Sequence, residues 1–196
     1  KECEKIKIKL PEDGKYGIGM FFLPIDSDQN KDAVKLIESA CSENDAEILG
    51  WRDVPVDPSC LGEKAEASRP DVKQAFIKCG NLAGKELERK LYLIRKVIDG
   101  KAAEAHFSIE DIYTASLSSR TIVYKGMFVA PQLEGFYDDL RREDFESSFS
   151  IVHQRYSTNT FPSWILAQPF RCIAHNGEIN TLRGNINWMN ARQALF

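Results

Sequence analysis

The chain has 196 residues, of which 43% are hydrophobic and 28% are charged. This composition is typical of a globular protein and excludes a disordered tail. The 26 Lys and Arg residues against 29 Asp and Glu residues give a net charge of −3, without the basic excess that binding to nucleic acid requires. Apolar runs stay well below the roughly 18 residues that span a bilayer. We expect neither nucleic acid nor a membrane as a partner.

The five cysteines are widely spaced, and none forms a C-x-x-C pair: they are Cys3, Cys41, Cys60, Cys79 and Cys172. This spacing favours neither a disulfide framework nor a zinc or iron–sulfur knuckle, and it fits a reducing compartment. Cys172 lies near His175, but no carboxylate completes a ligand set, so we expect no metal site. The expected location is the cytoplasm, or an organelle such as a plastid. Because the sequence starts at Lys1 and stops inside a predicted helix, we expect it to be a piece of a longer protein.

The first half of the chain alternates between strand and helix patterns. Ile6, Ile8 and Leu10 alternate with lysines, which indicates a strand with one wet face. Apolar residues between positions 32 and 44 recur at helical spacing, and either Asn30 or Asp32 can cap that helix. In chain order the patterns predict strands over 6–10 and 16–23, a helix over 32–44, a strand over 47–56, a loop over 57–70 and a short strand over 72–78.

The second half contains further strands and ends in a helix. Residues 86–98 are ambiguous, because their apolar positions suit both a helix and a strand that leads into one. Residues 111–117 and 121–125 are rich in β-formers, and the short polar link between them indicates a hairpin. The other patterns predict a loop with a short helical turn over 126–142, a strand over 149–155, a polar loop over 157–169, a strand over 170–174 and a helix over 180–196. Together these elements predict an α+β fold in which helices cover layered sheets, an αββα arrangement.

A polar segment over residues 153–160 follows one predicted strand, and loops that follow rigid strands often carry functional sites. Its Arg155 has a planar guanidinium that can bind a carboxylate or a phosphate through two parallel hydrogen bonds. The alternative is a structural arginine that ties the loop down, and from composition alone this is the more common role.

A second polar segment, residues 175–181, follows another predicted strand. Its Asn176 and Gly177 have two interpretations, since Asn-Gly is also the commonest short hairpin turn. As a functional pair, the Asn176 side-chain amide and the Gly177 backbone N–H can point at one position and form an oxyanion hole. Each such donor stabilises a developing oxyanion by about 3 kcal/mol. The missing Cβ of Gly177 would let a substrate oxygen come close.

The two segments belong to long motifs. The chain reads HQRYSTNTFPSW over 153–164, AQPF over 167–170 and AHNGEINTLRGN over 174–185. In these residues it closely resembles the class II glutamine amidotransferase domain of glutamate synthases. Other class II amidotransferases are similar only in a shorter pattern, a His-x-Arg-aromatic run followed later by His-Asn-Gly. Further similarity upstream extends the resemblance over nearly the whole chain from about Leu10.

The resemblance implies an N-terminal-nucleophile hydrolase fold, a four-layer αββα sandwich that is here incomplete at both ends. Residues 1–196 would be part of a single amidotransferase domain. The implied activity is hydrolysis of L-glutamine to glutamate and ammonia, which passes to a synthase site that aminates 2-oxoglutarate. No cofactor is implied for these residues, whereas FMN and an iron–sulfur cluster are implied for the parent protein. The implied partners are L-glutamine, the rest of the synthase chain and a small electron-donating subunit.

The resemblance also assigns roles to particular residues. Arg155 matches the arginine that holds the α-carboxylate of glutamine, and Asn176 and Gly177 match the pair that forms the oxyanion hole. Three further residues of the Arg155 loop are weaker candidates for substrate contact: Tyr156, Thr158 and Asn159.

The sequence departs from the family at the nucleophile. The family's nucleophile is a cysteine at the first position of the mature chain, whose own α-amino group, with a pKa of about 8, acts as general base. Here Lys1 stands first, and Cys3 has an amide nitrogen that accepts no proton. We therefore expect the nucleophile upstream of Lys1 and the acidic partner of the substrate's α-amino group downstream of Phe196. We also expect these 196 residues alone to be inactive toward glutamine.

Two other functions compete with this interpretation. One is a non-catalytic domain of the same ancestry that binds an amino acid or a partner protein, which a true N-terminus at Lys1 would favour. The other is a different N-terminal-nucleophile amide hydrolase. The pairing of Arg155 with Asn176 and Gly177 argues against a scaffold, and the length of the motifs argues against another hydrolase.

Overall fold

The computed structural model describes residues 8–158, 160–170, 173–174 and 182–193. Its centre is a four-stranded antiparallel sheet with strand order β2-β3-β1-β4. In chain order the strands are β1 (Gly17–Leu23), β2 (Glu47–Asp53), β3 (Asp71–Lys78) and β4 (Tyr113–Ser118). The α+β class predicted from the sequence is confirmed.

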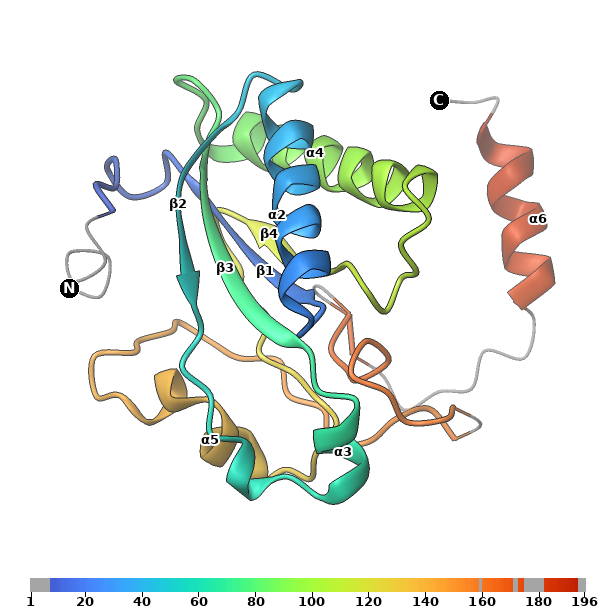
Figure 1. The fold of residues 1–196 in the computed structure, drawn as a ribbon. Helices are drawn as coiled ribbons and strands as arrows, with labels where there is room; N and C mark the ends of the chain where they lie inside the picture. Colours follow the sequence, from blue (N-terminus) through green and yellow to red (C-terminus); the bar gives the residue numbers. More distant parts are fainter. Residues whose placement is uncertain (1–7, 159, 171–172, 175–181, 194–196) are drawn as a thin grey trace.

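Two long helices, α2 (Ser27–Ser42) and α4 (Gly84–Glu104), cover one face of this sheet, as Figure 1 shows. Shorter elements pack against the opposite face: η1 (Pro58–Cys60), α3 (Glu63–Ala67), α5 (Gln132–Phe136) and η2 (Asp138–Arg141). Helix α6 (Leu182–Gln193) stands apart from the sheet in Figure 1, and most of its described side chains are exposed.

Strand β1 shows why both faces of the sheet are buried. Side chains alternate between the two faces of a strand. Phe21 and Leu23 therefore join the core under α2 and α4, whereas Met20 and Phe22 join the core on the opposite face. Burial of each such side chain contributes roughly 1.5–3 kcal/mol, so this strand ties the two cores together.

Strand β4 contains an irregularity that the sequence pattern did not reveal. The ladder with β1 skips Ala115, because Ser116 and Thr114 pair with consecutive residues of β1. An extra residue of this kind shifts the alternation by one position. Ala115 and Leu117 consequently face opposite cores, although they are two positions apart.

Helix α2 begins earlier than the sequence predicted. Its N-cap is Asp26, whose carboxylate accepts hydrogen bonds from two backbone N–H groups of the first turn at 3.1 and 3.0 Å. The predicted cap at Asn30 or Asp32 is wrong, because both residues lie inside the helix. The Asn30 amide instead donates to the carbonyl of Pro24 at 2.7 Å and to the carboxylate of Asp71 at 2.8 Å, which fixes the helix against β3.

The hairpin predicted from residues 111–117 and 121–125 is wrong in its second half. Residues 121–125 join no strand. The Ser118 hydroxyl accepts from two backbone N–H groups just after the strand at 3.0 and 3.1 Å, and the Ser116 hydroxyl accepts from Val123 at 3.2 Å. These side chains satisfy the backbone locally in place of a ladder.

Two segments are more helical than the sequence pattern suggested, and two predicted helical segments are confirmed. The ambiguous residues 86–98 are helical throughout and belong to α4. The loop predicted over 57–70 contains η1 and α3, and Asp57 caps η1 by accepting from a backbone N–H at 2.9 Å. The helical turn predicted within 126–142 is confirmed by α5 and η2, and the helix predicted over 180–196 is confirmed over its described part by α6.

Three further predicted strands do not form in the described residues. Residues 149–155 have no ladder partner there, and the strand predicted over 170–174 is reduced to one bridge between Phe170 and Ile173. Residues 8–10 are not in a strand, and the rest of the strand predicted over 6–10 lies outside the described residues. Alternating hydrophobicity produced a strand only where a neighbouring strand was available for hydrogen bonding.

Candidate functional site

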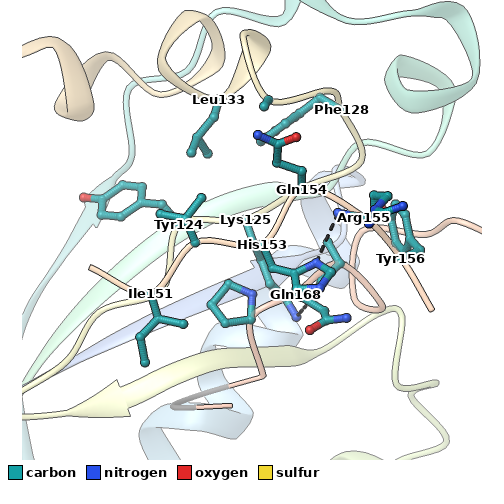
Figure 2. A pocket seen from close by; sticks show the side chains of 15 residues that line it. Tyr124, Lys125, Phe128, Leu133, Ile151, His153, Gln154, Arg155, Tyr156 and Gln168 are labelled. Atoms are coloured by element: carbon teal, nitrogen blue, oxygen red, sulfur yellow. Dashed lines mark hydrogen bonds between the residues drawn. The ribbon is translucent and has the colours of Figure 1, made fainter. Parts of the chain in front are cut away.

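Three segments line a cavity of about 140 Å³. They lie within residues 124–133, 151–156 and 167–169; the first begins after β4 has ended at Ser118, and it runs into α5. The cavity is roughly ten times the volume that admits one water molecule. Figure 2 shows Arg155 and Tyr156 on one side of it and Tyr124 and Ile151 on the other.

Arg155, the predicted carboxylate clamp, lines this cavity. Its side chain is exposed, and its backbone N–H donates to Nδ1 of His153 at 3.1 Å. Within the described part of the chain, no hydrogen bond or ion pair involves the Arg155 guanidinium. An exposed guanidinium on a residue that lines a cavity is suited to bind an anionic group through its planar fork.

The other predicted residues divide into two groups. Tyr156 lines the cavity and its hydroxyl donates to the carbonyl of Ser163 at 2.8 Å, while burial raises the pKa of Tyr156 to about 12. Thr158 is exposed and does not line the cavity. The remaining predicted site residues lie outside the described residues: Asn159, Asn176 and Gly177.

Lys125 is a cavity residue that sequence reasoning did not single out. It is only 2% exposed, and its Nζ lies 2.8 Å from the hydroxyl of Tyr113 and from the carbonyls of Ile165 and Ala167. Nζ also lies 4.9 Å from the centre of the Phe170 ring, within the range of a cation–π contact. Burial, and secondarily the positive charge of a nearby arginine, lower the pKa of Lys125 to about 7.

Tyr124, on the other side of the cavity, is held by a buried polar network. Arg52 forms a bidentate ion pair with Asp139, with N···O distances of 2.5 and 2.8 Å. The Tyr124 hydroxyl donates to Asp139 at 2.9 Å and accepts from Gln74 at 3.3 Å. Burial raises the pKa of Tyr124, and the Asp139 carboxylate adds to the shift, so the phenol stays protonated. The network joins β2, β3 and η2 to the cavity wall.

A signal for Lys125 is present in the sequence. It follows three apolar residues that begin at Ile122, and it precedes Gly126. A lysine after such a run either reaches the surface with its ammonium or, less commonly, is buried. The sequence alone does not distinguish these two possibilities. Gln168 also lines the cavity and lies in the loop predicted between the two motif segments.

The described cysteines are unsuited to act as nucleophiles. Cys41, Cys60 and Cys79 are free thiols. Burial raises the pKa of Cys41 to about 12 and also raises the pKa of Cys60 and of Cys79, which suppresses the reactive thiolate. Cys3 and Cys172 lie outside the described residues.

The described residues hold neither a metal-binding cluster nor a helix that could span a membrane. No group of three or more His, Cys, Asp or Glu side chains there could hold a metal ion. Among the helices that the structure describes, none is long and apolar enough to cross a membrane.

The whole chain, residues 1–196, matches the family of class II glutamine amidotransferases, and it therefore belongs to that family. Among individual proteins, it is 49% identical over 185 residues to the NADPH glutamate synthase large chain of Azospirillum brasilense and 47% identical over 198 residues to that of Bacillus subtilis. It is also 46% identical over 179 residues to the chloroplastic ferredoxin-dependent glutamate synthase 2 of Arabidopsis thaliana. The resemblance inferred from the two motif segments is confirmed.

These alignments cover 92%, 100% and 91% of this chain, but only 12%, 13% and 11% of the three relatives. The chain thus spans about an eighth of the length of the glutamate synthases it matches. The relatives are named for two different electron donors, NADPH and ferredoxin.

Proposed function

We propose that this chain is the glutaminase portion of a glutamate synthase. It would hydrolyse L-glutamine to glutamate and ammonia, and the ammonia would pass to a synthase site for amination of 2-oxoglutarate. The family match and the relatives support this proposal. The observation that carries it is Arg155, an exposed residue that lines the cavity and whose guanidinium has no hydrogen bond or ion pair within the described residues.

Arg155 is proposed to bind the α-carboxylate of glutamine. A bidentate guanidinium–carboxylate pair fixes orientation as well as position, because the two hydrogen bonds are parallel and coplanar. Tyr156 shares the cavity wall and presents a neutral phenol ring. Thr158 and Asn159 follow in the same loop and are proposed to contact the substrate once it is bound.

Asn176 and Gly177 are proposed as the oxyanion hole. They lie outside the described residues, so the proposal stands on the His-Asn-Gly motif and on chemistry. Attack on the side-chain amide of glutamine places negative charge on its oxygen. An amide N–H from each of these two residues would stabilise that charge by about 3 kcal/mol.

The nucleophile is proposed to come from outside these 196 residues. The described cysteines have raised pKa values, and every cysteine of the sequence has an amide nitrogen in place of the free α-amino group that serves as base in this family. On this proposal the 196 residues by themselves do not turn glutamine over.

The four-layer αββα sandwich is proposed for the complete domain, of which residues 1–196 would be one part. The described sheet has apolar side chains on both faces, and α2 and α4 cover only one of them. A second sheet would lie beyond the face that carries Met20 and Phe22, on the side of the cavity.

FMN and an iron–sulfur cluster are proposed for the parent protein only. The described residues offer no set of three or more potential ligands, so they do not fit an iron–sulfur cluster. The proposed partners are L-glutamine, the rest of the synthase chain and a small electron-donating subunit. A cytoplasmic or plastid location is proposed, the latter because the Arabidopsis relative is named as chloroplastic.

Covalent labelling of the full-length protein with an electrophilic glutamine analogue tests this function. Peptide mass spectrometry should locate the adduct on a cysteine outside residues 1–196. Arg155→Ala should slow labelling about 10- to 100-fold, the value of a charge-assisted hydrogen-bonded pair. Arg120→Ala is the matched control, because Arg120 is exposed and does not line the cavity; its labelling rate should stay within about twofold of the wild type.

Three other results would contradict parts of this proposal. No adduct at all, with glutamine still bound, would indicate a non-catalytic amino-acid-binding domain. An adduct on Cys172 or another cysteine of these residues would indicate a different catalytic arrangement. Equal labelling of wild type and Arg155→Ala would remove Arg155 from the substrate site.

A further inference from the structure

The buried ammonium of Lys125 has all of its donors in use. An ammonium has three N–H groups, and the Lys125 Nζ has three acceptors, each at 2.8 Å: the Tyr113 hydroxyl and the carbonyls of Ile165 and Ala167. No carboxylate of the described residues forms an ion pair with it. Burial of a lysine without a counter-charge is costly, and an apolar side chain of similar length would fill the space at lower cost. Packing alone therefore does not explain why a lysine occupies this buried position.

Two of the three bonds fix one short turn. Ile165 and Ala167 lie in a turn that begins at Trp164, whose indole N–H donates to the carbonyl of Ala65 in α3 at 3.1 Å. From Ala167 the chain continues directly into Gln168 and Pro169, and all three of these residues line the cavity. The carbonyls that Lys125 binds thus set the position of one cavity wall.

Lys125 is itself held from the other side. Its backbone carbonyl accepts a hydrogen bond at 2.8 Å from the hydroxyl of Tyr137, which is fully buried in the core. The side chain therefore extends from a fixed backbone to the turn that carries Ile165 and Ala167. Figure 2 shows Lys125 and Gln168 between Tyr124 on one side and Arg155 on the other.

We propose that Lys125 is a positioning residue of the glutamine site, which holds the carbonyls of Ile165 and Ala167 and thereby fixes the cavity wall formed by residues 167–169. This inference rests on the proposed function. Lys125 does not touch the reacting atoms; it keeps the shape of the space into which Arg155 orients the substrate.

Glutaminase kinetics of the full-length protein test this role. Lys125→Met keeps much of the side-chain volume and removes the donors. We expect its KM for glutamine to rise about 10-fold or more, because a small displacement of a binding wall is costly, while kcat changes much less. Lys73→Met is the matched control, since Lys73 is paired with Asp53 and Asp71 on the sheet and does not line the cavity. Its KM should equal that of the wild type.

A chemical rescue separates the ammonium from the volume it occupies. Lys125→Ala leaves space for n-propylamine, which should restore KM, whereas n-propanol should not. If Lys125→Met does not fold, Lys125→Ala purified in propylamine and then dialysed gives the same comparison.

Three outcomes would overturn the proposal: an unchanged KM in Lys125→Met, rescue by propanol as good as rescue by propylamine, or a loss of kcat with KM preserved. Failure of the proposed function gives a different result: the wild-type protein itself would release no glutamate from glutamine. If Arg155→Ala impairs glutamine turnover and Lys125→Met does not, the proposed function stands and only the role of Lys125 is excluded.

Discussion

The side chain of Lys125 is satisfied in either protonation state. As an ammonium it donates to all three neighbours, and as a neutral amine it can donate to the two carbonyls and accept from the Tyr113 hydroxyl. Because burial lowers the pKa of Lys125 to about 7, both forms are populated near neutral pH. The two carbonyl bonds persist in both, so the position of the turn does not depend on the charge.

The lowered pKa of Lys125 predicts a specific pH dependence of stability. In the unfolded chain this lysine titrates near its ordinary pKa of about 10.4. Above about pH 7 the folded state has lost a proton that the unfolded state retains, so stability should rise with pH, by at most about 1.4 kcal/mol per unit. Below about pH 7 both states are protonated and the group contributes no slope. Urea unfolding of wild type and Lys125→Met between about pH 6 and pH 8.5 measures this difference.

Comparison with the variant isolates the lysine from other titrating groups. The raised pKa values of Cys41 and Cys79 act in the opposite direction above about pH 8.5, because those thiols ionise more readily in the unfolded chain. They are present in both proteins and cancel in the difference. A difference in unfolding free energy that stays flat or falls between about pH 7 and pH 8.5 would contradict the prediction.

At the scale of elements, the contact of β1 with α4 depends on a glycine. A Cβ on Gly17 would overlap with Cδ1 of Leu91, well inside van der Waals contact. Leu91 is fully buried, so it has little space to move away. Gly17→Ala should therefore destabilise the 196-residue chain by about 1–3 kcal/mol in urea unfolding.

A double-mutant cycle checks the cause of that loss. Leu91→Ala alone should cost about 2–5 kcal/mol through the cavity it creates. The Gly17→Ala and Leu91→Ala pair should cost less than the sum, by about 0.5 kcal/mol or more, because the new methyl group enters that cavity. Gly100→Ala is the control, since Gly100 lies in α4 with no atom near its Cβ position, and it should stabilise by up to about 1 kcal/mol. If the two losses of unfolding free energy simply add, the cost of Gly17→Ala does not come from its contact with Leu91.

At the scale of the whole molecule, Trp164 joins the core to the cavity. Its ring lies 5.3 to 6.1 Å from the rings of Phe22, Phe128 and Phe136, and its indole N–H binds α3. Trp164→Ala should destabilise the chain by about 3–5 kcal/mol. Trp188→Ala is the matched control, because Trp188 is 72% exposed on α6, and it should change stability by less than about 0.5 kcal/mol.

Thermal and urea unfolding of these two variants measure the prediction. An equal loss of stability in both variants would mean that Trp164 does not connect the core to the cavity wall. A large loss in Trp188→Ala alone would instead show that α6 packs against the rest of the domain.

Much of the element order could be predicted from the sequence. The four strands of the sheet and the helical character of α2 follow from spacing, because period 2 and period 3.6 report which side chains share a face. The N-cap of α2 could not be predicted in this way, because Asp26, Asn30 and Asp32 are all good cap residues. Only the hydrogen bond of Asn30 to Asp71 in the folded chain decides among them. The failed strand over 121–125 shows the same limit, because serine hydroxyls of β4 competed with the ladder.

The sequence by itself determined the family and the candidate substrate clamp, because long motifs around Arg155 and Asn176 constrain residue type at fixed spacing. Only the tertiary structure could bring Arg155 to one cavity with Tyr124 and Lys125, and only it paired Arg52 with Asp139, 87 residues apart. The physical reason is that local pattern reports which face of an element is apolar. The burial of a charge, and the groups that satisfy it, depend on segments that meet only when the chain is folded.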